Sequence, residues 1–356
     1  MCINILNLPD DKKRIIDALL DKVESKYKND IAIVVCYGSY ISGTAHPKSD
    51  IDFFFIPKTE KGYEINLQFI IDDIGYDFWS LSWERAEQIA NFEEPVTSII
   101  ADGVIIYYCD SDDLKRFSLL RHRIKDITAK PENKEFLVNK AEELLAKAKI
   151  IFFDMIYISN DYEIVDSNCS KILGLLFNII SLLNLTYIKK GVYNIEDEIK
   201  AYSVLPEKFL DLFNSAVRSS NITDKIDFVK KLMISVDMLV QKKKYKKETK
   251  ISNNSFKGFY EELKSTYNKL IHACNSKDYL KVFFTVHSID FATKNILGEK
   301  YKDFNFPNLI VQLGSNDYDK LIESTYQHEK ALVNILKTYK IDVIKYENIN
   351  QFIESL

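Results

Sequence analysis

Two aspartates near the start of an apolar segment are the side chains best suited to chemistry. Asp50 and Asp52 flank Ile51 and lead into the apolar run 53–56. Because alternate residues of an extended chain point to the same face, we expect both carboxylates side by side and Ile51 in the core. Such a pair repels itself unless a cation lies between, and hard oxygen ligands with room for phosphate oxygens suit Mg²⁺. The pair therefore predicts a magnesium site.

A turn of small residues precedes the two carboxylates. The apolar segment 31–36 has the composition of a buried strand and runs through Tyr37 into Gly38 and Ser39. The turn is expected to open a short helix, whose backbone N–H groups can hold a phosphate together with the Ser39 hydroxyl. Strand, turn and carboxylates together indicate a metal-dependent nucleotide site.

This stretch resembles the signature of the nucleotidyltransferase superfamily related to DNA polymerase β, in which Gly-Ser precedes Asp-x-Asp by about this distance. The run 38–45 before Ser49-Asp50-Ile51-Asp52 is most similar to minimal nucleotidyltransferases and to bacterial enzymes that modify aminoglycoside and lincosamide antibiotics. The similarity extends over roughly residues 30–110. It implies an α+β fold in which residues 1–111 form a catalytic domain around a small mixed sheet.

The same resemblance implies a third carboxylate on a later strand that faces the first two. Asp77, an isolated acid inside the apolar and aromatic run 74–80, is the candidate, and Asp72 and Asp73 are its rivals in what we expect to be a solvated loop. The resemblance assigns catalysis and metal binding to Asp50, Asp52 and Asp77, and nucleotide binding to Gly38, Ser39 and Ser49.

A helical segment farther along the chain offers another pair of charged residues. Glu143 and Lys147 are four residues apart and so share one face of a helix. In antibiotic nucleotidyltransferases a carboxylate on such a helix deprotonates the acceptor hydroxyl, and a lysine one turn on contacts the triphosphate. The resemblance assigns these two roles to Glu143 and Lys147. An exposed ion pair without a chemical role is the alternative, and Glu142 and Lys149 compete for the same roles.

The pattern of apolar residues divides the rest of the chain. Beyond residue 112 it becomes helical, which predicts an acceptor-binding helical bundle over 112–245 and a further helical region over 255–356. A lysine-rich run and a polar loop over 241–255 separate the two, and we interpret the run as a solvated helix end and linker. The long apolar stretch 172–188 contains several polar residues, which favours a buried bundle helix over a membrane span.

Composition and charge narrow the choice of partner. The chain has 356 residues, 46% of them hydrophobic, enough for two or three packed units. Residues 1–110 contain 10 Lys and Arg but 19 Asp and Glu, which makes the catalytic part a poor platform for a nucleic-acid backbone. Five scattered cysteines without metal spacing, and no recognisable signal peptide, favour a cytoplasmic protein.

Together these features predict a Mg²⁺-dependent nucleotidyltransferase with one or two metal ions. It would move a nucleoside monophosphate, AMP from ATP in the simplest case, to a hydroxyl of a small acceptor such as an aminoglycoside-type antibiotic, and release pyrophosphate. Two alternatives stay open: a protein- or RNA-directed nucleotidyltransferase of the toxin–antitoxin kind, and a non-catalytic regulator that binds nucleotide. The choice of NTP, the acceptor and the oligomeric state are not fixed by the sequence.

Overall fold

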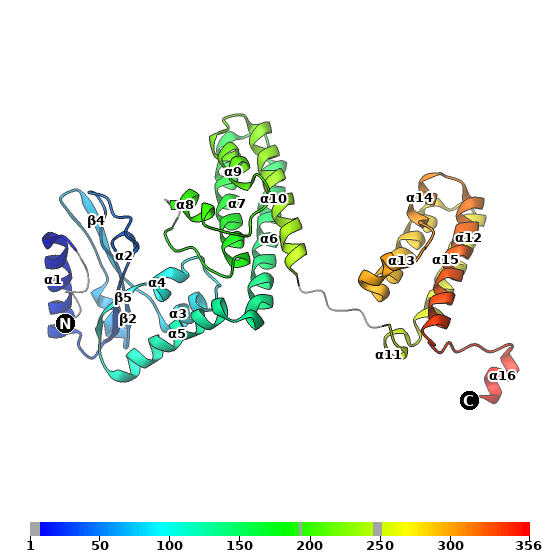
Figure 1. The fold of residues 1–356 in the computed structure, drawn as a ribbon, viewed down its shortest axis with the longest axis horizontal. Helices are drawn as coiled ribbons and strands as arrows, with labels where there is room; N and C mark the ends of the chain where they lie inside the picture. Colours follow the sequence, from blue (N-terminus) through cyan, green and yellow to red (C-terminus); the bar gives the residue numbers. More distant parts are fainter. Residues whose placement is uncertain (1–7, 192–193, 245–250) are drawn as a thin grey trace. The chain divides into compact units, whose positions relative to one another are not determined.

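The computed structural model describes residues 8–191, 194–244 and 251–356. The chain forms two compact units, residues 1–245 and 246–356. A five-stranded mixed sheet lies in the N-terminal part and helices follow it, so the predicted α+β fold with a helical C-terminal region is confirmed (Figure 1). Most of the predicted lysine-rich linker, residues 245–250, lies outside the described residues, as does Cys2.

The sheet has the strand order β3-β4-β2-β1-β5. β1 pairs antiparallel with β2 and β5, β3 pairs antiparallel with β4, and β2 pairs parallel with β4. The hairpin turn between β3 and β4 consists of Asp72 and Asp73, which are exposed and have φ angles of 53° and 59°. The two rivals of Asp77 therefore lie in a solvated turn, as expected. The strand bounds are Ile31–Tyr37 (β1), Asp52–Pro57 (β2), Leu67–Ile71 (β3), Ile74–Ser80 (β4) and Val104–Tyr108 (β5).

Helices cover both faces of this sheet. On one face α1 (Asp10–Lys26) packs its buried residues against Val34, Phe53 and Phe55. On the other face α3 (Trp83–Ala90), α4 (Thr97–Ala101) and α5 (Ser111–Ala129) contribute to a core with Val35 and Phe54. Neighbouring strand residues such as Phe53 and Phe54 thus serve different cores, since their side chains point to opposite faces.

The helices after α5 extend the hydrophobic core that contains Val35 and Phe54. Four of them pack as a bundle, and their buried side chains form one cluster with those of the sheet. A polar contact also joins the helical bundle to the sheet region. The hydroxyl of Tyr187, which follows α7, donates to Oδ1 of Asp102, which follows α4, at 2.8 Å. The predicted functional division at residue 111 stays a prediction. The helices are α6 (Lys134–Tyr157), α7 (Tyr162–Leu183), α9 (Phe209–Arg218) and α10 (Ile222–Lys243), with the short α8 (Ile195–Lys200) between α7 and α9.

The apolar helix of the bundle is α7. Within the described residues it is the one helix that is long and apolar enough to cross a membrane, and 61% of its most apolar window is buried in the protein. It begins ten residues earlier than the apolar stretch 172–188 suggested, because Asp161 caps it by accepting from the N–H groups of Glu163 and Ile164. Its burial agrees with the predicted bundle helix.

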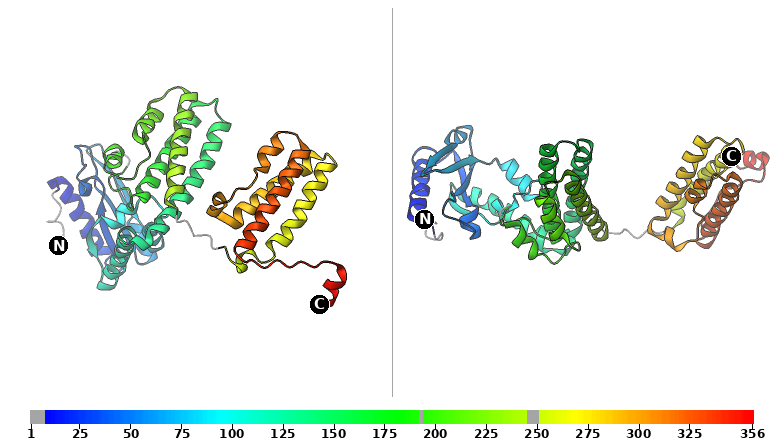
Figure 2. Two further views of the ribbon diagram at one scale, coloured as in Figure 1. Left: turned by 45° about the vertical axis from the view of Figure 1, so that its right-hand side comes forward. Right: turned by 90° about the horizontal axis from the view of Figure 1, so that it is seen from above.

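In the second unit, every secondary-structure element of the described residues 251–356 is a helix. α12 packs against α13 and α15, and Leu270, Ile289 and Leu332 belong to the core between these helices (Figure 2). A polar pair is buried there, since Tyr267 and His328 form a hydrogen bond of 2.8 Å. The helices are α11 (Asn253–Phe256), α12 (Phe259–Asn275), α13 (Tyr279–Leu297), α14 (Leu309–Gly314), α15 (Tyr318–Thr338) and α16 (Ile349–Glu354).

Candidate active site

The turn after β1 has a backbone conformation that requires glycine. Gly38 has a φ of 83° and begins the short helix α2 (Ser39–Ser42), whose Ile41 and Ser42 N–H groups donate to the Gly38 carbonyl. A Cβ atom on Gly38 would lie 1.8 Å from Asp52 Oδ2. The turn can therefore bring its backbone against the carboxylate only because residue 38 has no side chain.

Asp50 and Asp52 lie where alternation predicted them. Ile51 and Phe53 are buried, while the two aspartates are half-buried on the other side of the chain at the start of β2. The Ser39 N–H donates to the Asp52 carboxylate. Burial, and then repulsion from Asp50, nevertheless raise the pKa of Asp52 from 3.8 to about 6. The backbone N–H donors of Ser39 and Asp52 therefore do not offset the cost of burying the Asp52 charge beside Asp50.

Asp77 lies beside Asp52 on the neighbouring strand β4. The parallel register pairs Phe53 with Phe78, so the preceding residues, Asp52 and Asp77, are neighbours across the two strands. Asp77 is exposed, and Gln68 Nε2 donates to its Oδ1 at 2.6 Å. The structure therefore brings Asp77 to the pair formed by Asp50 and Asp52.

A half-buried tyrosine lies among these acids. Tyr37 pairs in register with Asp52, and its hydroxyl accepts a hydrogen bond of 2.9 Å from Trp79 Nε1. Burial is the largest cause that raises the pKa of Tyr37 to about 12, and the charges of Asp52, Asp77 and Asp50 add to it. Neither aromatic residue stands out in the sequence, because an aromatic residue near a strand end is ordinarily a core residue.

Ser49 shapes the loop that delivers Asp50. Its side chain is buried, its hydroxyl accepts from the His46 N–H at 2.9 Å, and its own N–H donates to the His46 carbonyl. The hydroxyl therefore has a partner inside the loop. Its predicted contact with nucleotide stays a prediction.

Glu143 and Lys147 are exposed on α6, but they do not pair with each other. Lys140 Nζ lies 3.2 Å from Glu143 Oε2, and the described part of the chain contains no ion pair between Glu143 and Lys147. Their competitors are engaged within the bundle, Glu142 with Lys244 and Lys149 with Asp237, each at 2.7 Å. In the ranges that the structure describes, no hydrogen bond or ion pair connects α6 to the three aspartates.

The three aspartates suit a hard divalent cation. They offer only carboxylate oxygens, which are the ligands that Mg²⁺ prefers. Asp77 is exposed, and Asp50 and Asp52 are half-buried. Burial and then the charge of Asp50 raise the pKa of Asp52, so a bound cation would favour its ionised form. Asp50, Asp52 and Asp77 therefore fit a magnesium site on the chemistry of their donors.

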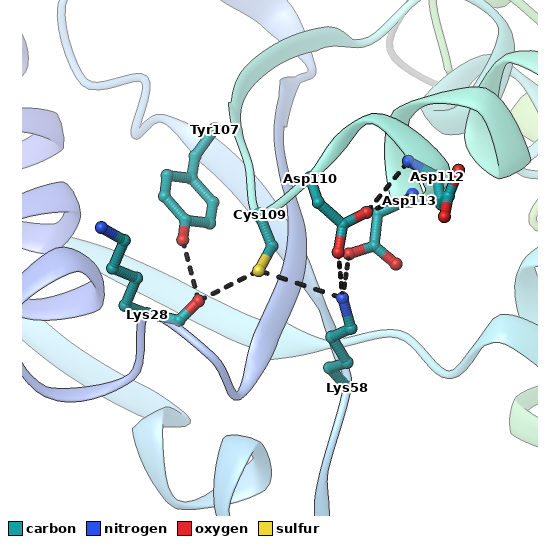
Figure 3. Close-up of polar contacts among 7 residues, drawn as sticks. All are labelled: Lys28, Lys58, Tyr107, Cys109, Asp110, Asp112 and Asp113. Atoms are coloured by element: carbon teal, nitrogen blue, oxygen red, sulfur yellow. Dashed lines mark hydrogen bonds and ion pairs between the residues drawn. The ribbon is translucent and has the colours of Figure 1, made fainter.

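A second acidic cluster, which residue spacing alone does not reveal, lies at the start of α5. One ligand atom each from Cys109, Asp110 and Asp113 lies within 4.8 Å of the others. Lys58 Nζ occupies the centre of this cluster, 2.8 Å from Asp113 Oδ2, in ion-pair contact with Asp110 and 3.9 Å from Cys109 Sγ (Figure 3). Asp110 also caps α5 through the N–H groups of Asp112 and Asp113. The Lys58 ammonium group thus already neutralises the carboxylates of this cluster. We therefore assign the cluster a structural role rather than a metal-binding one.

A match to a family model supports a nucleotidyltransferase domain in the N-terminal part of the chain. Residues 16–157 match the model of the nucleotidyltransferase domain family, a range that contains all five strands and ends with α6. Among solved structures, a nucleotidyltransferase-like protein from Exiguobacterium sibiricum is similar to this chain at 9% sequence identity and a TM-score of 0.37. The alignment covers 64% of this chain and 75% of the Exiguobacterium chain. No curated protein matches the chain.

Proposed function

We propose that the nucleotidyltransferase domain of this chain transfers a nucleoside monophosphate, AMP from ATP, to a hydroxyl of a small acceptor with release of pyrophosphate. The family match over residues 16–157 supports nucleotide transfer in general. The observation that carries the finer proposal is the grouping of Asp50, Asp52 and Asp77 beside the Gly38–Ser39 turn.

Each residue of this group has a definite part in the proposal. Asp50, Asp52 and Asp77 hold one or two Mg²⁺ ions, which when bound would neutralise the triphosphate and polarise its phosphoryl oxygens. Gly38 and Ser39 contact the phosphates. Because the Ser39 N–H is taken up by Asp52, Ser39 contributes its hydroxyl. The remainder of the rate enhancement comes from holding the acceptor oxygen in line with the α-phosphorus.

Two carboxylates compete for the proton of the acceptor hydroxyl. Asp77 is the exposed member of the acidic group and lies beside Asp52 on the neighbouring strand. Glu143 is exposed on α6, and Lys147, one turn on, is also exposed and would contact the triphosphate. We assign the base to Glu143 and the completion of the metal site to Asp77, since a metal-bound carboxylate is a weak base.

The charge of the catalytic part favours a small cationic acceptor. With 19 acidic against 10 basic residues in the first 110, its field attracts amines and repels nucleic-acid backbones. An aminoglycoside-type antibiotic has the required hydroxyls and positive charge. Cys36, Cys169 and Cys274 are buried free thiols, which fits a reducing compartment such as the cytoplasm.

The test is incubation with α-labelled ATP, GTP, CTP or UTP, Mg²⁺ and a panel of aminoglycosides, lincosamides, protein and tRNA. The Asp50→Asn/Asp52→Asn variant is the control. We expect label on one small acceptor and none with the control. Label on protein or RNA would move the assignment to a macromolecular target. Nucleotide binding without transfer to any acceptor would favour the regulator instead.

A further inference from the structure

A hydrogen bond between two aromatic side chains crosses the sheet at the candidate site. Trp79 Nε1 donates to the Tyr37 hydroxyl at 2.9 Å. Tyr37 is the last residue of β1, Trp79 lies in β4, and β2 runs between these two strands. The two side chains must therefore meet over β2.

The bridge joins the strand positions that carry two of the acids. Tyr37 is the register partner of Asp52, and Asp77 precedes Trp79 by two residues and so points to the same face of β4. Phe54 lies beneath the bridge, with its ring centroid 5.8 Å from that of Tyr37 and 5.8 Å from that of Trp79. The two aromatic residues and the two acids thus occupy adjacent positions on one face.

The Trp79 end of the bridge is fixed from a third element. The Arg85 guanidinium lies over the indole, 5.4 Å from the ring centroid. Glu94 holds Arg85 through two hydrogen bonds of 2.9 and 2.8 Å. Ser82 caps α3 by accepting from the Arg85 N–H. The indole is therefore held by its own N–H and by a clamped cation over its ring.

The acids need such a restraint because they repel one another. Before a cation binds, the charges of Asp50, Asp52 and Asp77 act to separate the ends of β2 and β4. Asp77 itself has one side-chain partner, Gln68, in the described part of the protein. We propose that Tyr37 and Trp79 are positioning residues whose hydrogen bond holds Asp52 and Asp77 at the separation at which both bind one divalent cation. This inference rests on the proposed function.

The test is the affinity of the full chain for Mn²⁺ alone, measured by electron paramagnetic resonance, which needs no acceptor. Tyr37→Phe keeps the ring and removes only the hydroxyl, and Trp79→Phe removes the donor. We expect each variant to bind Mn²⁺ about tenfold more weakly, the effect of one hydrogen bond of ordinary strength. The double variant should bind no more weakly than either single one, because both remove the same bond.

Tyr107→Phe is the matched control. Tyr107 is also a half-buried tyrosine of this sheet, and its hydroxyl donates to the Lys28 carbonyl at 3.1 Å (Figure 3). It lies in β5, which pairs with β1, whereas Asp52 and Asp77 lie in β2 and β4. We expect this variant to lose stability as Tyr37→Phe does, yet to bind Mn²⁺ like the wild type. Wild-type affinity in Tyr37→Phe and Trp79→Phe, with none in Asp52→Asn, would overturn the positioning role alone. Wild-type affinity in Asp52→Asn would overturn the metal site and the proposed function with it.

Discussion

The Asp52 carboxylate lies against the backbone of Gly38, so close that a Cβ atom there would be 1.8 Å from Asp52 Oδ2. Gly38 also has a φ of 83°, a conformation that residues with a side chain rarely adopt. The close contact with Asp52 and the positive φ angle are thus two independent reasons why residue 38 must be glycine. The position of the turn and the position of the carboxylate depend on each other.

Gly38→Ala should therefore displace Asp52 rather than unfold the protein. We expect nucleotide transfer to fall by about 100-fold, the usual cost of moving a reacting group by about 1 Å. Gly43→Ala is the control, because Gly43 has a φ of 74° but nothing within 4 Å of its Cβ position. It should lose stability and keep most of the activity. Equal activity losses in the two variants would mean that backbone strain, not contact with Asp52, is what matters.

The pKa of Asp52 predicts how stability changes with pH in the absence of metal. Folding raises this pKa from 3.8 to about 6, chiefly through burial and then through Asp50. A raised carboxyl pKa stabilises the fold below the unfolded-state pKa, and this stabilisation is lost as the pH rises through about 6. Relative to Asp52→Asn, the wild type should lose up to about 3 kcal/mol of unfolding free energy between pH 4 and pH 7. Urea titrations in a chelator measure this difference, and parallel pH curves for the two proteins would contradict it.

Mg²⁺ should reverse this loss. A cation bound between Asp50 and Asp52 neutralises the charge that folding makes unfavourable, so the metal stabilises the native state by mass action. At a Mg²⁺ concentration of 100 times its Kd the gain is about 2.7 kcal/mol, seen as a rise in melting temperature at pH 7. Removal of the ion with a chelator should restore the lower value. The Asp50→Asn/Asp52→Asn variant should show no rise, and a rise of equal size there would place the metal elsewhere.

The assignment of the base to Glu143 can be tested against its neighbour. Glu143→Gln should lower kcat by about 10²- to 10⁴-fold, the range of general-base catalysis, with little change in the KM for ATP. Glu142→Gln removes a carboxylate one residue away whose partner is Lys244, so it should affect stability and not kcat. A kcat unchanged in Glu143→Gln would leave an exposed ion pair with Lys140 as its only role and would favour Asp77 as the base.

The local part of the site could be predicted from the sequence. The alternation around Ile51 placed Asp50 and Asp52 on one side of the chain, because strand geometry relates residues two apart without knowledge of the rest of the fold. The Gly38–Ser39 turn follows from the same kind of local rule. Asp77 needed the family resemblance, since the parallel register of β2 and β4 joins residues 25 positions apart.

The remaining features depend on contacts that spacing does not reveal. Tyr37 and Trp79 are 42 residues apart and meet only because β1, β2 and β4 are consecutive in the sheet. Helical spacing permits Glu143 to pair with a residue three or four positions away in either direction, and the structure has Lys140 as its partner rather than Lys147.

The contact of Lys58 with the second acidic cluster leads to the last prediction. Its ammonium group lies between Asp110 and Asp113, which are held at the start of α5, and this proximity raises the pKa of Lys58 and lowers that of Asp110. Lys58→Met keeps the length of the side chain and removes the charge, so the two carboxylates repel and the melting temperature should fall by a few degrees. Because this cluster is separate from Asp52, the Mn²⁺ affinity of the folded variant should equal that of the wild type. A tenfold weaker affinity would show instead that the two acidic groups act as one site.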